Sequence, residues 1–181
     1  MPLNQLKRYP ELLEILHLSP SSRNESLREI FNRDIEDNPD FSFRGKRIYP
    51  IKSDGRPDMD RQFMHLTSCV ENTVDATEGD QSPRRRIFDK DRSMRLHWIR
   101  HHIEERLADM IEIFSIEERD MQRRQNVVKT YIYDKREKYV IVKEPHRSGT
   151  SYYLLSAYYL NREYGEKDLK RKMKKRLPVV F

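Results

Sequence analysis

Hydrophobic and polar positions alternate most regularly in the last third of the chain. Two runs rich in β-branched and aromatic residues, 127–133 and 139–144, flank a short polar turn at 134–138. A third run, 150–160, holds many tyrosines. Alternation with a period of two is typical of strands, because successive side chains point to opposite faces of a sheet. These runs predict an antiparallel hairpin followed by a third strand.

Apolar residues spaced three and four positions apart predict the helices. Ser22 and Glu25 have the spacing of a capping box, which marks a helix start. The stripe that follows, Leu27, Ile30 and Phe31, is expected to face the core. Helices are predicted in this way at 6–16, 22–37, 59–66, 89–110 and 167–176.

The order of these elements predicts an α+β fold. We expect a small antiparallel sheet with helices packed on one face, preceded by a mainly helical N-terminal module with short strands. Residues 71–83 are polar and offer little to bury, so a mobile linker and the boundary between modules are expected there. The expected domains are therefore 1–82 and 83–181.

Charge is spread unevenly along the chain, whose net charge is +6. Residues 1–90 hold 15 Lys and Arg against 16 Asp and Glu, whereas residues 91–181 hold 21 against 14. A basic half of this kind favours a polyanionic partner, and nucleic acid is the commonest one.

Cysteine content and hydropathy narrow the class of protein further. Cys69 is the single cysteine, which excludes an internal disulfide and a thiolate zinc cage. The chain has no apolar run long enough to cross a membrane, and its first residues lack the apolar core of a signal peptide. We therefore expect a cytoplasmic protein with no membrane partner.

The tyrosine-rich run 150–160 places hydroxyl groups on both faces of its strand. A strict period of two would put Tyr152, Ser156 and Tyr158 on one face, and Tyr153 on the other. Tyrosines are also good strand formers that cover the edge of a core, which is the structural alternative. Ser156 and Tyr158 are the candidate site residues of this strand, because their hydroxyls can position or protonate phosphate oxygens.

The loop before this strand, 143–149, brings together groups suited to phosphate chemistry. His146 can exchange a proton near neutral pH, and Arg147 can bind a phosphate through two hydrogen bonds. Lys143 adds an ammonium group. A solvated hairpin loop would collect the same residue types, so that alternative stays open.

The segment 95–102, RLHWIRHH, carries basic and aromatic residues on one predicted helix. Arg95 and Arg100, together with the nearby Arg92, are candidate phosphate clamps, with an ordinary charged helix face as the alternative. Trp98 is expected to pack on the sheet at the border of the RNA-binding surface. His97 and His101 are one turn apart, but no cysteine or carboxylate stands at the spacing of a known metal motif. No metal site is therefore expected.

The densest basic cluster lies near the end of the chain. A stripe of Leu169, Met173 and Leu177 favours a docked helix with a basic outer face over a solvated tail. Such a face binds phosphate backbones without reading sequence. The expected RNA-binding residues are Lys170, Arg171, Lys174 and Lys175 in this cluster, with Trp98, Arg100 and Tyr152 elsewhere.

Three stretches of the second half follow the pattern of a known group of proteins: RLHWIRHHIEE, KTYIYDKREKYVIVKEP and SYYLLSAYYLNREYGEKDLKRK. Through them, residues 84–176 resemble the phage-associated nuclease families of the barnase–EndoU–colicin–RelE superfold. The families' Arg-x-x-Trp-Ile motif falls on Arg95, Trp98 and Ile99, and their Thr-Ala-Tyr position corresponds to Ser156-Ala157-Tyr158. The resemblance implies a nuclease-like domain and a toxin-type, metal-independent endoribonuclease carried by a phage or another mobile element.

The expected activity is RNA cleavage by attack of the ribose 2′-hydroxyl on the adjacent phosphate, without a cofactor. This reaction needs a base, an acid and a cationic cradle. His146 is the expected acid or base with His97 as the alternate, Arg147, Arg95 and Lys143 stabilise charge, and Ser156 and Tyr158 hold phosphate oxygens. The expected partners are RNA, with transfer RNA as a candidate, and an immunity or antitoxin protein. The alternative is a non-catalytic, phage-encoded nucleic-acid-binding or regulatory protein.

Overall fold

The structure, a computed structural model, describes residues 3–53, 55–70, 85–106, 109, 111–121, 123–161 and 163–181. Its helices are α1 (Leu3–Leu6), α2 (Pro20–Phe31), the π-helix η1 (Asn32–Glu36), α3 (Met59–Thr67), α4 (Lys90–Ser93), α5 (Trp98–Ile103) and α6 (Glu163–Met173). Its strands are β1 (Ser42–Phe43), β2 (Lys46–Tyr49), β3 (Lys52–Ser53), β4 (Arg56–Pro57), β5 (Ser68–Val70), β6 (Arg86–Phe88), β7 (Ile111–Asp120), β8 (Gln125–Asp134), β9 (Tyr139–Pro145) and β10 (Ser151–Tyr159).

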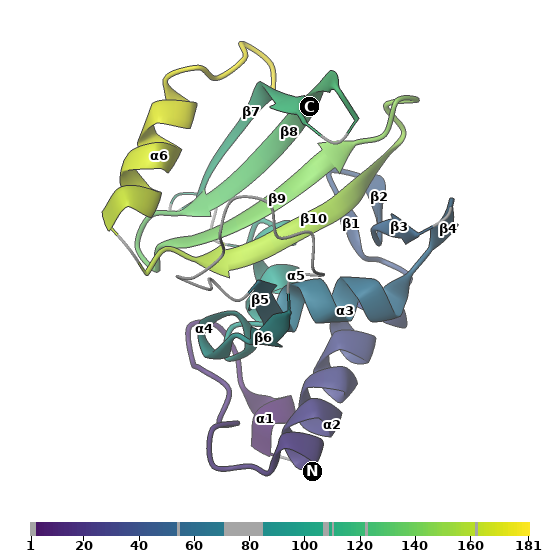
Figure 1. The fold of residues 1–181 in the computed structure, drawn as a ribbon, viewed down its shortest axis with the longest axis vertical. Coiled ribbons are helices and arrows are strands. Elements are labelled where there is room, and N and C mark those ends of the chain that lie inside the picture. The colour runs from purple at the N-terminus through teal and green to yellow at the C-terminus, as the bar shows by residue number, and fades with distance from the viewer. Residues whose placement is uncertain are drawn as a thin grey trace.

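A six-stranded sheet organises the fold, in the order β1-β2-β10-β9-β8-β7 (Figure 1). Its neighbouring strands run antiparallel except β2 and β10, which pair in parallel over three residues each. The predicted hairpin corresponds to β8 and β9, and the predicted third strand to β10. The α+β class is therefore confirmed.

Helices cover both faces of this sheet. Along β8, Ile132 contributes to a first core that α2, α3 and α5 complete, whereas Tyr131 and Tyr133 contribute to a second core. Leu169 of α6 closes the second core, and α6 lies beside the sheet, apart from the other helices (Figure 1). The structure thus differs from the expected sheet with helices on one face. The apolar stripe of α6 needs an apolar surface, and the first face is already occupied.

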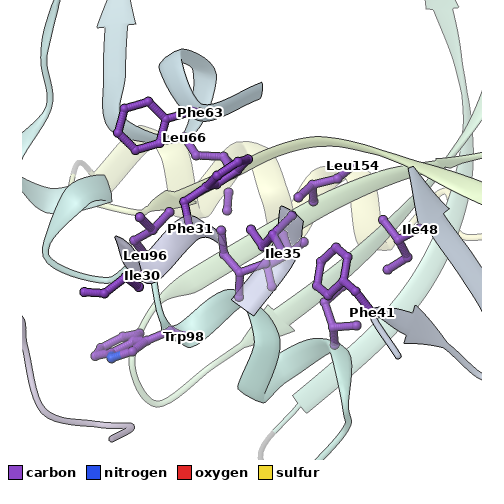
Figure 2. Packing of buried hydrophobic residues seen from close by; sticks show 14 of the residues in the cluster. Ile30, Phe31, Ile35, Phe41, Ile48, Phe63, Leu66, Leu96, Trp98 and Leu154 are labelled. Atoms are coloured by element: carbon purple, nitrogen blue, oxygen red, sulfur yellow. The ribbon is translucent and has the colours of Figure 1, made fainter. Parts of the chain in front are cut away.

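The first core joins the two halves of the chain. Figure 2 shows Phe31 and Ile35, from the first half, packed in the same cluster as Leu154 of β10. Ile48 of β2 lies in this cluster too, opposite Tyr152 in the parallel pairing. The expected boundary at 82 and 83 lies outside the described residues. The segments on either side of it share one core and one sheet.

Strand β10 contains a β-bulge that changes which residues share a face. Leu154 and Ser156 pair with consecutive residues of β9, so Leu155 is the extra residue. A bulge of one residue turns the later side chains to the opposite face. Tyr152 is accordingly buried in the first core, whereas Tyr158 packs against the second. The expectation that Tyr152, Ser156 and Tyr158 share one face is wrong.

The predicted helices have different bounds in the structure. The helix expected at 6–16 does not form, because α1 ends at Leu6 and the residues after it, up to 16, adopt turns and irregular backbone. The helix expected at 89–110 is divided into α4 and α5. Between them, the N–H groups of Arg95, Leu96, Trp98 and Ile99 bond to the carbonyl three positions back rather than four. The helix expected to begin at Ser22 begins at Pro20, where the Ser19 hydroxyl accepts a hydrogen bond from the backbone of Ser22. In the part of the chain that the structure describes, no helix is long and apolar enough to cross a bilayer.

Candidate functional site

A hollow of about 280 Å³ lies on the sheet face that carries the second core, at the end where β9 turns into β10. We call it the sheet-face hollow. Leu155, which packs against the second core, forms one border of it. Its polar lining residues are Lys52, Arg123, Gln125, Glu144, His146, Arg147 and Tyr153.

The loop between β9 and β10 holds His146 at the rim of this hollow. The backbone N–H of His146 donates to the carbonyl of Ser151, and Gly149 donates to the carbonyl of His146, each at 2.8 Å. Gly149 has a φ of +71°, a conformation that glycine adopts without strain. Nδ1 of His146 lies 2.8 Å from the hydroxyl of Ser148. The ring centroids of His146 and Tyr153 lie 5.5 Å apart in a T-shaped arrangement. The imidazole is therefore held in place by its own turn.

Glu144 brings a carboxylate into the same hollow. It directly opposes Tyr153 of β10 in the ladder. Arg123 donates from Nη1 to the Glu144 carboxylate at 2.6 Å, and this bond is the main cause that raises the pKa of Arg123. An imidazole and a carboxylate two residues apart on β9 and its loop thus border one space. Both are groups that exchange protons in catalysis.

Cations surround this pair. Nζ of Lys52 lies 5.5 Å from the ring centroid of Tyr153, and Nη2 of Arg147 lies 3.5 Å from the amide oxygen of Gln125. Together with Arg123, they place three positive groups around the hollow against one carboxylate, Glu144. The lining is therefore suited to an anionic group such as a phosphate.

Ser156 and Tyr158 lie further along β10, beside helix α4. Arg92 donates from Nη1 to the Ser156 hydroxyl at 3.4 Å, and its guanidinium lies 5.9 Å from the centroid of Tyr158. Burial raises the pKa of Tyr158 to about 12. The tyrosine-rich strand and an arginine of the preceding helical segment are thus neighbours, as expected. The arginine is Arg92, and neither hydroxyl lines the sheet-face hollow.

Arg95 and Trp98 are engaged in packing. Arg95 donates from Nη1 to the carbonyl of Asp91 at 2.9 Å, and its guanidinium lies 4.0 Å from the centroid of Tyr159. Trp98 is 1% exposed, and its indole N–H donates to the carbonyl of Glu11 at 3.0 Å. Neither residue presents a free face to RNA. Tyr152, at 3% exposure, is buried as well.

Lys143 lies on the opposite face of the sheet from Glu144. It is fully buried, with Nζ 3.3 Å from the centroid of Phe43 and 3.5 Å from that of Tyr152. Burial, aided by the nearby charge of Arg44, lowers the pKa of Lys143 to about 6. Alternation along β9 separates Lys143 from the sheet-face hollow, so it cannot touch a phosphate bound there.

His97 and Arg100 border a different hollow, beside the N-terminal segment. Burial is the main cause that lowers the pKa of His97 to about 4. His101 lines the same space, but no group of three or more His, Cys, Asp or Glu side chains among the described residues could hold a metal ion. His97 was the predicted alternate to His146 as acid or base, but the two histidines line different hollows.

The basic cluster of α6 and of the turn that follows it is exposed, as the sequence predicts. Its positive face is turned to solvent while Leu169 is buried beneath it. The exposed residues are Lys170, Arg171, Lys174 and Lys175. This face can meet a phosphate backbone without any rearrangement of the helix.

Five polar residues of the sheet-face hollow are not among the site residues predicted from the sequence: Lys52, Arg123, Gln125, Glu144 and Tyr153. Glu144 was predictable, because alternation along 139–144 places it on the opposite face of the strand from Lys143. It also stands two positions before His146 in the sequence, which favours a place near that imidazole. Lys52 and Arg123 carried no such signal, since each looks like an ordinary surface charge and only the fold brings it to the hollow.

No family model, no curated protein and no solved structure matches this chain. The function proposed below therefore rests on the geometry of the sheet-face hollow and its surroundings.

Proposed function

We propose that this protein is a metal-independent endoribonuclease that cleaves RNA at the sheet-face hollow. The observation that carries the proposal is the pair Glu144 and His146, two proton-exchanging groups in one hollow with Lys52, Arg123 and Arg147 around them. Cleavage by internal attack needs a base, an acid and positive charge at the phosphate. All three are available within this one set of side chains.

The reaction balances without an added reagent. One of the pair, Glu144 or His146, removes the proton from the 2′-hydroxyl, whose oxygen attacks the adjacent phosphorus in line. The bond from phosphorus to the 5′-oxygen breaks, and the other group donates a proton to that oxygen. The products are a 2′,3′-cyclic phosphate and a 5′-hydroxyl. Lys52, Arg123 and Arg147 stabilise the negative charge that accumulates on the phosphate oxygens.

Two further features support RNA as the substrate. The exposed basic face of α6 provides a sequence-independent contact for the phosphate backbone through Lys170, Arg171, Lys174 and Lys175. The resemblance of residues 84–176 to phage-associated toxin nucleases points to the same chemistry. As part of the proposal, the enzyme acts in the cytoplasm on RNA such as transfer RNA. An acidic immunity or antitoxin protein would neutralise its basic surface.

Removing either proton-exchanging group is expected to abolish most of the cleavage. His146→Ala and Glu144→Gln should each lower the cleavage rate by roughly a hundredfold or more, the usual contribution of a general acid or base. The measurement is the initial rate on end-labelled RNA in excess EDTA, with the cyclic phosphate product identified by mass. The two variants should each lose one limb of the pH–rate profile, and the limb that is lost assigns base and acid.

The control is His17→Ala, which removes an exposed histidine far along the chain from the hollow. It should cleave at the rate of the unmodified protein. Absence of cleavage by the unmodified protein, or equal rates in all variants, would rule the proposal out.

The alternative is a non-catalytic nucleic-acid-binding protein, and the observation that favours it is the exposed basic face of α6. In that case RNA would bind with an affinity that falls steeply with salt and would remain intact. Charge reversal at Lys174 and Lys175 would then weaken binding without any change in product.

A further inference from the structure

A second and larger hollow, of about 570 Å³, lies beside the N-terminal segment. We call it the N-terminal hollow. Residues 5–9 form one side, η1 forms another, and α5 with Arg106 forms a third. It shares no lining residue with the sheet-face hollow. Its volume is within the usual range for small-molecule sites.

The lining of the N-terminal hollow is strongly positive. Asp34 is the single carboxylate among its lining residues. The cations come from three separate parts of the chain: Lys7, Arg8, Arg33, Arg100 and Arg106. The four guanidinium groups among them are the candidate anion-binding groups. Guanidinium groups bind phosphates through two parallel hydrogen bonds.

Three of these guanidinium groups are held in fixed positions. Arg33 donates to both oxygens of the buried Asp34, at 2.8 and 2.6 Å. Arg100 and Arg106 donate from Nε to the two oxygens of Glu104, at 2.7 and 2.6 Å. Each carboxylate thus orients its arginines before any ligand arrives. Preorganised donors bind tightly because little side-chain entropy remains to be lost.

Two further observations point to a ligand here. Arg33 and Asp34 stand on a π-helix, a rare conformation that occurs frequently at functional sites. His97 is 6% exposed and lines the hollow, and neither ring nitrogen makes a hydrogen bond of good geometry to a described residue. The backbone carbonyls of Arg8 and Glu11 favour the protonated form of His97, but neither makes a hydrogen bond of good geometry to its ring. Buried polar groups of this kind are uncommon in native proteins.

We propose that the N-terminal hollow is a binding site for a small molecule that carries a diphosphate or triphosphate group. Its phosphates contact Arg8, Arg100 and Arg106, and His97 lines the same hollow. The site is separate from the proposed centre for RNA cleavage.

Isothermal titration with ATP and with inorganic pyrophosphate tests this proposal on the full-length chain. Both probes should bind saturably at one site per chain, more weakly as salt rises. The double variant Arg8→Gln, Arg106→Gln should lose at least tenfold in affinity, because each change removes a charge-assisted hydrogen bond. ATP should also shift the ring signals of His101 in NMR spectra and leave those of His17 unmoved.

The matched control is the double variant Arg56→Gln, Arg136→Gln, which removes the same charge from exposed positions outside both hollows. Its affinity should stay within twofold of the unmodified protein. No saturable binding, equal losses in both double variants, or binding to long RNA but to neither small probe would each overturn the proposal. Failure of RNA cleavage would leave it standing, since the titration requires no catalysis.

Discussion

Replacing Lys143 by methionine is expected to stabilise the protein by on the order of 3 kcal/mol at pH 7. Burial lowers the pKa of Lys143 from 10.5 to about 6, so folding must remove its proton at neutral pH. That removal costs about 5 kcal/mol at pH 7. Replacement also gives up the packing of the neutral amine against the rings of Phe43 and Tyr152, which leaves a net gain on the order of 3 kcal/mol. Methionine fills a similar volume without a charge. The gain should raise Tm by about 6–12 °C.

The pH dependence of this gain follows from the direction of the shift. Between about pH 6 and 10.5 the unfolded chain holds the Lys143 proton and the folded chain does not. Stability therefore rises with pH in this window, and the cost is fully present only below about pH 6. The advantage of Lys143→Met should shrink by roughly 1.4 kcal/mol for each unit of rising pH. Denaturant unfolding at pH 7, 8 and 9 measures it.

Lys46→Met is the matched control for Lys143→Met. Lys46 lies 5.7 Å from the ring of Tyr152, the same ring that Lys143 contacts, but it is only half-buried. Its substitution should change stability by less than about 1 kcal/mol. An advantage of Lys143→Met that stays constant from pH 7 to 9 would contradict the buried, neutral amine. Since Lys143 faces away from the sheet-face hollow, the variant should keep its rate on RNA.

Asp134→Asn is expected to destabilise the protein by about 3 kcal/mol. Asp134 is fully buried and accepts hydrogen bonds from His102 at 2.8 Å and from Tyr9 at 2.7 Å. It also accepts from the backbone N–H groups of Arg136 and Glu137, each at 3.0 Å. The carboxylate therefore ties the N-terminal segment, α5 and the β8–β9 turn to one point. An amide cannot accept all four bonds, and Tm should fall by about 6–12 °C.

The acid response of Asp134 provides an independent check. Burial alone would raise its pKa, but the bonds from His102, Glu137 and Tyr9 outweigh burial and lower the pKa to about 2. Its contribution to stability is therefore present above the unfolded value of 3.8 and is lost as pH falls through about 2. Asp134→Asn should remove this part of the acid transition. Asp168→Asn, at a partly exposed position of α6, should leave Tm nearly unchanged.

The strands of the last third were predictable because each is determined locally. Branched and aromatic side chains in alternation specify β8 and β9 without reference to the rest of the chain. The stripe at Leu169 and Met173 likewise specifies α6. The face that α6 covers was not predictable, because it depends on which face the N-terminal helices occupy.

The candidate site was predictable only in part, for a related reason. His146 and Arg147 stand in one short loop, so their proximity follows from the sequence itself. The bulge at Leu155 depends on how β10 pairs with β9, and it moves Tyr152 away from Tyr158. Lys52 and Arg123 reach the hollow through contacts between distant segments, which no local pattern contains. His97 carries the right chemistry for the site and lies at another hollow.

The parallel pairing of β2 with β10 has a consequence for how the chain is made. The ribosome synthesises Lys46–Tyr49 long before Ser151–Tyr159. Strand β2 therefore lacks its β10 partner during most of translation. Contacts between such distant segments slow folding, and unpaired strand edges recruit other chains in the meantime. Nascent molecules should therefore depend on chaperones until the final residues emerge. If the protein is toxic to the cell that makes it, this delay also postpones the moment at which it becomes active.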